Sequence, residues 1–134
     1  MSEDALAAWG ELGALGTLRA SIERRFPTES SVATERLASC GFDESAHIIW
    51  LEEFGRTTTK AISALDEQTV DAHLGFMSQQ WARGGESVRS AIDVAYVEPL
   101  LSGLKIDRQR WAWARMPAHL KKLYIAMWGE PRFN

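Results

Sequence analysis

Apolar residues recur every three or four positions along most of the chain, which is the spacing of one face of an α-helix. The spacing is clearest in two consecutive runs, with Trp50, Phe54, Ala61 and Leu65 in the first and Val70, Leu74, Met77 and Trp81 in the second. Between them, Asp66 is a suitable N-cap for the second helix, which Gly84-Gly85 can end. The pattern therefore predicts an antiparallel helical hairpin joined by a tight turn.

A long first helix is expected at the start of the chain. Ser2 or Asp4 can cap it, and it should run to about Phe26, because a proline at position 27 disfavours a helical conformation in the residue before it. Three glycines lie within it at intervals of three, at Gly10, Gly13 and Gly16. Glycine is a poor helix former, so this spacing indicates either a close contact with a neighbouring helix or a break.

A short helix should follow from Ser31 to Cys40, with Gly41 as its C-terminal stop. Asp43 is the expected N-cap of the next helix, the first of the hairpin. No segment before or after it shows the sustained period-two alternation of a strand, and there is no Asn-Gly or Asp-Gly hairpin turn.

The remaining third of the chain also has helical spacing. The apolar positions of its first helix are Val88, Ile92, Ala95 and Tyr96, and those of its last helix are Leu120, Leu123, Met127 and Trp128. Pro99 lacks the amide that would bond to Ala95, so a kink or an early end is expected there. A short helix is expected from Asp107 to Ala114, and Pro117 suits the first turn of the last helix, which ends at Gly129. Together these elements predict an all-α, compact bundle of about five to seven helices, built from antiparallel hairpins as one domain over residues 1–134.

The cysteine content and the first residues of the chain indicate a cellular location. Cys40 is the only cysteine, so the chain cannot form an internal disulfide, and a reducing cytoplasm is the simplest location. The acidic start MSEDALAAWGEL lacks the basic flank and apolar run of a signal peptide. No stretch approaches the roughly 20 apolar residues that span a bilayer, so we expect a protein that does not contact a membrane.

Charge is distributed unevenly along the chain. Residues 1–67 contain 12 acidic and 6 basic side chains, whereas residues 68–134 contain 6 and 9. Such asymmetry can steer a charged partner toward one face, although solvated helices also show it. The candidates for contact with a basic partner are the acidic residues of the first hairpin and its turn, namely Glu52, Glu53, Asp66, Glu67 and Asp71.

The segment 105–122 has the opposite character, because it has six basic residues against one acid and contains Trp111 and Trp113. Cations interleaved with aromatic rings bind single-stranded nucleic acid by neutralising phosphates and stacking on bases. Arg108, Arg110 and Trp113 are the candidates for that activity. The net charge of −3 and the lack of a known nucleic-acid module favour ordinary surface charge instead.

Catalytic and metal sites have little support in the sequence. The three histidines, at positions 47, 73 and 119, lie on different predicted helices, and none has a histidine or cysteine three or four residues away. Asp93 and Glu98 are the remaining candidate pair, but residues five apart are separated by about 140° around an ideal helix. We expect these carboxylates to be structural, and no metal or cofactor is predicted.

Several segments between Ile48 and Gly129 resemble a known family, namely IWLEEFGRTTTKAI, HLGFMSQQ, AIDVAYVEPLL, WAWARMP and LKKLYIAMWG. The family consists of small, all-helical bacterial proteins that occur beside toxin genes and look like immunity or antitoxin-type proteins. The resemblance implies no enzyme activity and a cognate toxin domain as the partner. The matching positions, most of them expected to be structural, are Trp50, Phe54, Phe76, Asp93, Tyr96, Glu98 and Pro99.

Three function classes follow from these observations. The first is a non-enzymatic immunity protein that binds a bacterial toxin and occludes its active site, with the acidic residues of the hairpin as contacts. The second is a nucleic-acid-binding regulator that uses residues 105–122. The third is an enzyme with a site around Asp93, Glu98 and a histidine. We expect the first.

Overall fold

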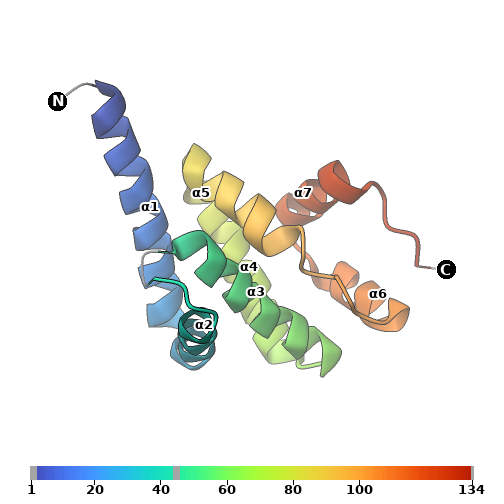
Figure 1. Cartoon of the computed structure of the whole chain (residues 1–134). Coiled ribbons are helices and arrows are strands. Elements are labelled where there is room, and N and C mark those ends of the chain that lie inside the picture. Colours follow the sequence, from blue (N-terminus) through green and yellow to red (C-terminus); the bar gives the residue numbers. More distant parts are fainter. Residues whose placement is uncertain (1–2, 44–45, 134) are drawn as a thin grey trace.

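The computed structural model describes residues 3–43 and 46–133, with side chains from residue 13 onward. Every regular element in these residues is helical, as the sequence predicts (Figure 1). The elements are α1 (Glu3–Arg25), α2 (Pro27–Ser39), α3 (His47–Ser63), α4 (Glu67–Arg83), α5 (Glu86–Ala91), the π-helix η1 (Ile92–Val97), α6 (Ile106–Arg115) and α7 (Ala118–Trp128). Consecutive helices pack on one another, which gives the predicted all-α bundle.

The first helix is continuous past its glycines, so the break, one of the two alternatives that their spacing left open, does not occur. It ends at Arg25 beside the proline, as predicted, and Asp4 lies within it rather than capping it. The alternative cap, Ser2, lies outside the described residues. The second helix begins at Pro27, four residues earlier than predicted, because proline at the first helical position loses no hydrogen bond and has a suitable fixed φ. Gly41 stops this helix with a φ of 82°, as predicted.

Helices α3 and α4 form a hairpin as predicted, and most of the predicted details of this hairpin are confirmed. Asp66 accepts a hydrogen bond from the Thr69 amide at 3.2 Å and so caps α4. Leu65 is the exception, because it lies in the turn with a φ of 56° and is 42% exposed instead of joining the apolar stripe. Asp43 is not the cap of α3 either, since that helix starts at His47 with Ala46 in the N-cap position.

The helix that precedes Pro99 is wider than an α-helix over its last residues. The Glu98 amide bonds to the carbonyl of Asp93, five residues earlier, at 2.9 Å, so the final turns are π-helical. The chain then leaves the helix through a turn that reaches Gly103. The predicted kink or early end therefore takes the form of a widened turn, which is a common feature beside functional sites.

The last two helices begin and end close to their predicted positions. Pro117 precedes α7, and Gly129 ends that helix with a φ of 81°. Leu120 is fully buried, but Met127 and Trp128, both predicted on the apolar stripe, are exposed by 44% and 59%. Helix α7 is the last helix of the bundle, and these two side chains at its end remain open to solvent (Figure 1).

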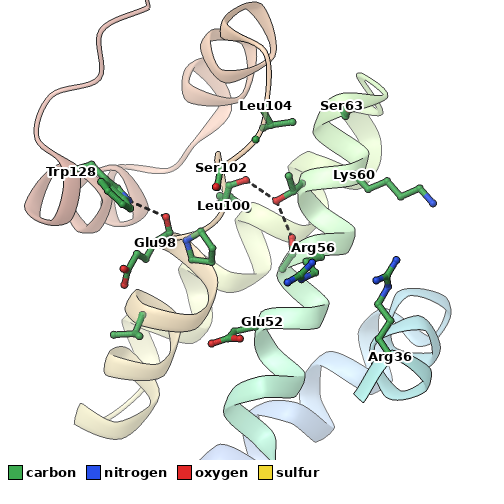
Figure 2. Close-up of a pocket in the computed structure, with 15 residues that line it drawn as sticks. Arg36, Glu52, Arg56, Lys60, Ser63, Glu98, Leu100, Ser102, Leu104 and Trp128 are labelled. Carbon is green, nitrogen blue, oxygen red and sulfur yellow. Dashed lines mark hydrogen bonds between the residues drawn. The ribbon is translucent and has the colours of Figure 1, made fainter. Parts of the chain in front are cut away.

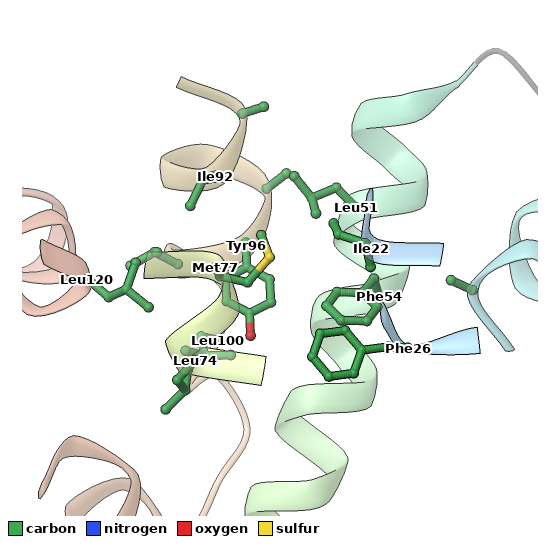
Figure 3. Packing of buried hydrophobic residues seen from close by; sticks show 14 of the residues in the cluster. Ile22, Phe26, Leu51, Phe54, Leu74, Met77, Ile92, Tyr96, Leu100 and Leu120 are labelled. Carbon is green, nitrogen blue, oxygen red and sulfur yellow. The ribbon is translucent and has the colours of Figure 1, made fainter. Parts of the chain in front are cut away.

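Helix α3 is the centre of the packing and contacts α1, α2, α4, α6 and η1. Its buried aromatic rings, those of Trp50 and Phe54, stack with centroids 5.9 Å apart. Phe54 also packs against Phe26 and Tyr96, so side chains from several helices form one hydrophobic cluster (Figure 3). Burial of these large side chains supplies the main driving force for the fold.

Candidate functional site

A groove lies between α3 and the segment that follows η1 (Figure 2). Its volume is about 870 Å³, within the range of pockets that hold ligands. One wall, from α2 and α3, consists of Arg36, Glu52, Gly55, Arg56, Thr59, Lys60 and Ser63. The other wall consists of Val94, Glu98, Pro99, Leu100, Ser102, Gly103, Leu104 and Trp128. We call this site the α3 groove.

A hydrogen bond and close packing hold the two walls together. The Thr59 hydroxyl lies 2.6 Å from the Leu100 carbonyl and donates to it across the groove. Beneath it, α3 approaches η1 at Gly55, where an added Cβ would meet the Tyr96 ring at 3.3 Å. A larger residue would therefore push the walls apart, so the small residue helps to define the shape of the groove.

Trp128 is an exposed aromatic side chain in a fixed position. Its indole N–H donates to the Glu98 carbonyl at 3.0 Å, while most of the ring remains open to solvent. Val94 on the same wall is 51% exposed. A rigid, amphipathic ring beside an exposed aliphatic side chain is typical of the anchors at protein interfaces.

Three of the charged side chains that line the α3 groove lie along one face of α3. Glu52, Arg56 and Lys60 are four residues apart and therefore lie in a row on α3. Arg56 approaches Glu53 at 3.5 Å, yet its side chain is 69% exposed. Arg36 and Lys60 are exposed, and neither forms an ion pair with another described residue. The wall thus presents three accessible cations.

The structure does not assemble the predicted acidic residues into one patch. Glu52 lies in the α3 groove, whereas the carboxylate of Glu53 is mostly buried beside Arg56. Asp66 caps α4 and is exposed. Glu67 and Asp71 both pair with the Arg115 guanidinium, at 3.2 and 2.9 Å. That contact joins the acidic and basic parts of the chain, so these charges partly neutralise one another.

The basic segment also makes contacts within the chain. Arg108 donates to the Ser63 carbonyl at 3.1 Å, and Arg110 donates to the Phe133 carbonyl. Trp113 packs edge-on against Tyr124, with ring centroids 5.4 Å apart. These three residues are therefore engaged in tertiary structure, and binding of single-stranded nucleic acid stays a prediction that an oligonucleotide titration at low salt can test.

Asp93 and Glu98 occupy different surroundings. Glu98 lines the α3 groove and Asp93 does not. One carboxylate oxygen of Asp93 is buried without a hydrogen bond, and burial raises the pKa of that carboxyl. No group of three histidine, cysteine or carboxylate side chains in the described ranges is arranged to hold a metal ion. The arrangement does not form an acid–base pair in a shared pocket.

His73 is the most strongly perturbed histidine. Its ring is fully buried, and its Nδ1 lies 2.8 Å from the Thr58 hydroxyl, which lies 2.9 Å from the Tyr96 hydroxyl. Burial lowers the pKa of His73 to about 4, although the carboxylates of Glu29 and Asp66 act in the opposite direction. The ring is neutral at pH 7, and it is closed to substrates, so it is a structural side chain.

Sequence reasoning missed most of the residues of the α3 groove. The row Glu52, Arg56 and Lys60 was visible as a four-residue spacing, but its cations were not singled out. Arg36 and Trp128 come from distant parts of the chain and join the site only through packing.

Comparison with known proteins gives a single family. The model of a family described as a domain of unknown function (DUF7674) matches residues 19–129, which extends well before the resemblance beginning near Ile48. No curated protein and no solved structure gives a significant match to the chain. Within the described residues, every helix is too short or too polar to cross a membrane.

Proposed function

We propose that this chain, which belongs to the family described as a domain of unknown function (DUF7674), is a non-enzymatic immunity protein that binds a bacterial toxin domain. The resemblance to proteins that occur beside toxin genes supports the class of partner. The α3 groove supports the binding role, because it is open, has rigid walls and contains exposed apolar side chains. Binding there occludes the part of the toxin that enters the groove.

The observation that supports this proposal most strongly is the exposure of two apolar side chains, Trp128 and Val94, that both line the α3 groove. Large apolar side chains usually enter the core of a domain this small, and an exposed cluster of them marks an interaction site. Trp128 is also fixed by its bond to Glu98, so a partner that packs on it loses little additional side-chain entropy.

The polar groups of the groove favour binding over catalysis. Glu52 and Glu98 face it from opposite walls, but the groove contains neither a histidine nor a cysteine. Its two serines, Ser63 and Ser102, have no hydrogen bond from their hydroxyls to a base among the described residues, so the activated nucleophile of covalent catalysis is not formed there. The side chains that line the groove support recognition by shape, apolar contact and charge.

A protection assay with candidate toxins encoded beside this gene tests the proposal. Cells that express the toxin should grow when the wild-type chain is co-expressed, and the two proteins should co-elute as a complex. Val94→Arg places a charged side chain on the apolar wall and should weaken the complex about tenfold or more. Gln79→Arg, on an exposed position of α4 outside the groove, is the matched control and should protect fully.

Charge reversal tests the acidic contact that the sequence predicted. Glu52→Lys should reduce protection, because this carboxylate lies in the α3 groove, where the reversal would repel a basic residue of the partner that contacts it. Glu86→Lys, at an exposed position on α5, is the control. The proposal is wrong if no neighbouring gene product binds the wild-type chain, and the groove is the wrong surface if Val94→Arg and Glu52→Lys protect as well as their controls.

A further inference from the structure

The two walls of the α3 groove differ in chemistry. The wall from α2 and α3 presents the cations Arg36, Arg56 and Lys60, whereas the opposite wall is mainly apolar. We propose that the groove binds an amphipathic, acidic peptide segment of the partner, with its carboxylates on the cationic wall and its apolar side chains on Val94 and Trp128. The inference rests on the proposed function, because it specifies the chemistry of the toxin segment that the groove holds.

The side chains of the cationic wall can still bind an anion. Arg36 on α2 and Lys60 on α3 are exposed and lack an ion-pair partner among the described residues. Arg56 approaches one carboxylate, Glu53, at 3.5 Å, so most of its five N–H donors remain available. Figure 2 shows Arg36 and Arg56 extending toward the same region from different helices. Carboxylates bound there would relieve the repulsion between these cations.

The apolar wall requires side chains that a simple anion does not have. Val94, Pro99, Leu104 and Trp128 form it, and the indole ring of Trp128 is oriented by its bond to the Glu98 carbonyl. An occupant that covers both walls must be apolar on one side and acidic on the other. An amphipathic peptide segment has this property, since side chains on its two faces differ.

The carboxylates in the groove argue against nucleic acid as the occupant. Glu52 continues the row of Arg56 and Lys60 on α3, and Glu98 lies on the opposite wall. A polyphosphate chain that follows the groove would meet the Glu52 carboxylate, whereas a peptide can place a neutral or basic residue there. The mixture of charges therefore favours a polypeptide partner.

Two synthetic peptides test the inference without the toxin. One is acetyl-Glu-Leu-Glu-Leu-Glu-Leu-amide, and the other has lysine in place of each glutamate. In an NMR titration of the full-length protein, the acidic peptide should shift the backbone amides of residues 36, 56 and 60 and the indole resonance of Trp128. The double variant Arg36→Glu and Lys60→Glu should bind about tenfold more weakly, whereas Lys122→Glu, at an exposed position of α7 outside the groove, should bind like wild type.

The inference is overturned if the lysine peptide binds the groove as tightly, if the shifts lie elsewhere, or if a single-stranded oligonucleotide binds the same residues more tightly. The toxin complex separates this result from the proposed function. If the toxin binds the double variant as tightly as wild type, the acidic-segment inference fails while the immunity proposal stands. If no toxin binds but the acidic peptide does, the immunity proposal fails and the chemistry of the groove is retained.

Discussion

His73 makes the stability of the hydrophobic core depend on pH. Its ring lies between Phe26 and Phe54, with centroids 4.4 and 4.9 Å away, and Thr58 is its hydrogen-bond partner. The Nε2 atom is buried without a hydrogen bond, and the nearest carboxylate, Glu29, is 3.9 Å away. Protonation would therefore place a charge in an apolar environment with weak compensation, which is why burial lowers the pKa.

We predict that the protein loses stability as pH falls from about 6.5 to about 4, because His73 has a pKa of 6.5 when unfolded and about 4 when folded. The unfolded chain binds more protons in that interval, and at about 1.4 kcal/mol per pH unit this histidine contributes a loss of about 3 kcal/mol. Urea unfolding at a series of pH values measures the effect.

The variant His73→Gln should be less stable at pH 7 but should show a shallower decline toward pH 4, because the titrating group is gone. Gln79→Ala, which replaces an exposed and non-titrating residue of α4, is the control and should keep the wild-type slope. An unchanged slope in His73→Gln would show that other groups cause the acid sensitivity.

At the scale of elements, glycines in two helices have different roles. Gly75 lies within α4, and an added Cβ would meet no atom within 4 Å. Gly55 lies within α3, where the same addition would meet the Tyr96 ring at 3.3 Å. Helix propensity alone predicts the same stabilisation for alanine at both sites, so the difference between them measures how closely α3 and η1 pack.

We predict that Gly75→Ala raises the free energy of unfolding by about 1 kcal/mol, because alanine loses less backbone entropy in a helix. Gly55→Ala should give a smaller gain or a loss, since the Tyr96 ring must move to admit the new methyl group. Urea denaturation of both variants measures the effect. Equal gains at the two positions would show that the walls of the α3 groove separate without a penalty.

At the scale of the whole molecule, the aromatic cluster around Phe54 connects most of the helices. Its ring is fully buried and packs against Phe26 at the α1–α2 junction, His73 on α4 and Tyr96 on η1. Since these contacts join elements from the N-terminal and C-terminal halves of the chain, we expect the helices to unfold together.

We predict that Phe54→Ala lowers the free energy of unfolding by about 3 to 5 kcal/mol, the range for removing a buried aromatic ring. Phe42→Ala is the control and should change it by about 0.5 kcal/mol or less, because Phe42 is 47% exposed. In the wild type, urea transitions followed by helical circular dichroism and tryptophan fluorescence should coincide. Separate transitions would contradict the single domain that the sequence predicts.

The local sequence determined most of the helices of this protein. Capping by Asp66, the glycines that end α2 and α7, and the prolines beside α1 and α7 act through short-range sterics and hydrogen bonds. Such interactions depend on neighbouring residues, so their effects can be read from the chain. The errors at the start of α2 and at Leu65 arose within one turn of a helix end, where several local conformations compete.

Only the tertiary structure decided which side chains form a site. Helical spacing places Glu52, Arg56 and Lys60 in one row, but it cannot indicate that Arg36 and Trp128 lie beside them. The same limit applies to Glu67 and Asp71, whose pairing with Arg115 depends on the packing of α4 against α6. Periodicity in the sequence shows which side chains share one face of a helix. Long-range packing decides which other residues that face contacts, because packing depends on the shapes of all the helices together.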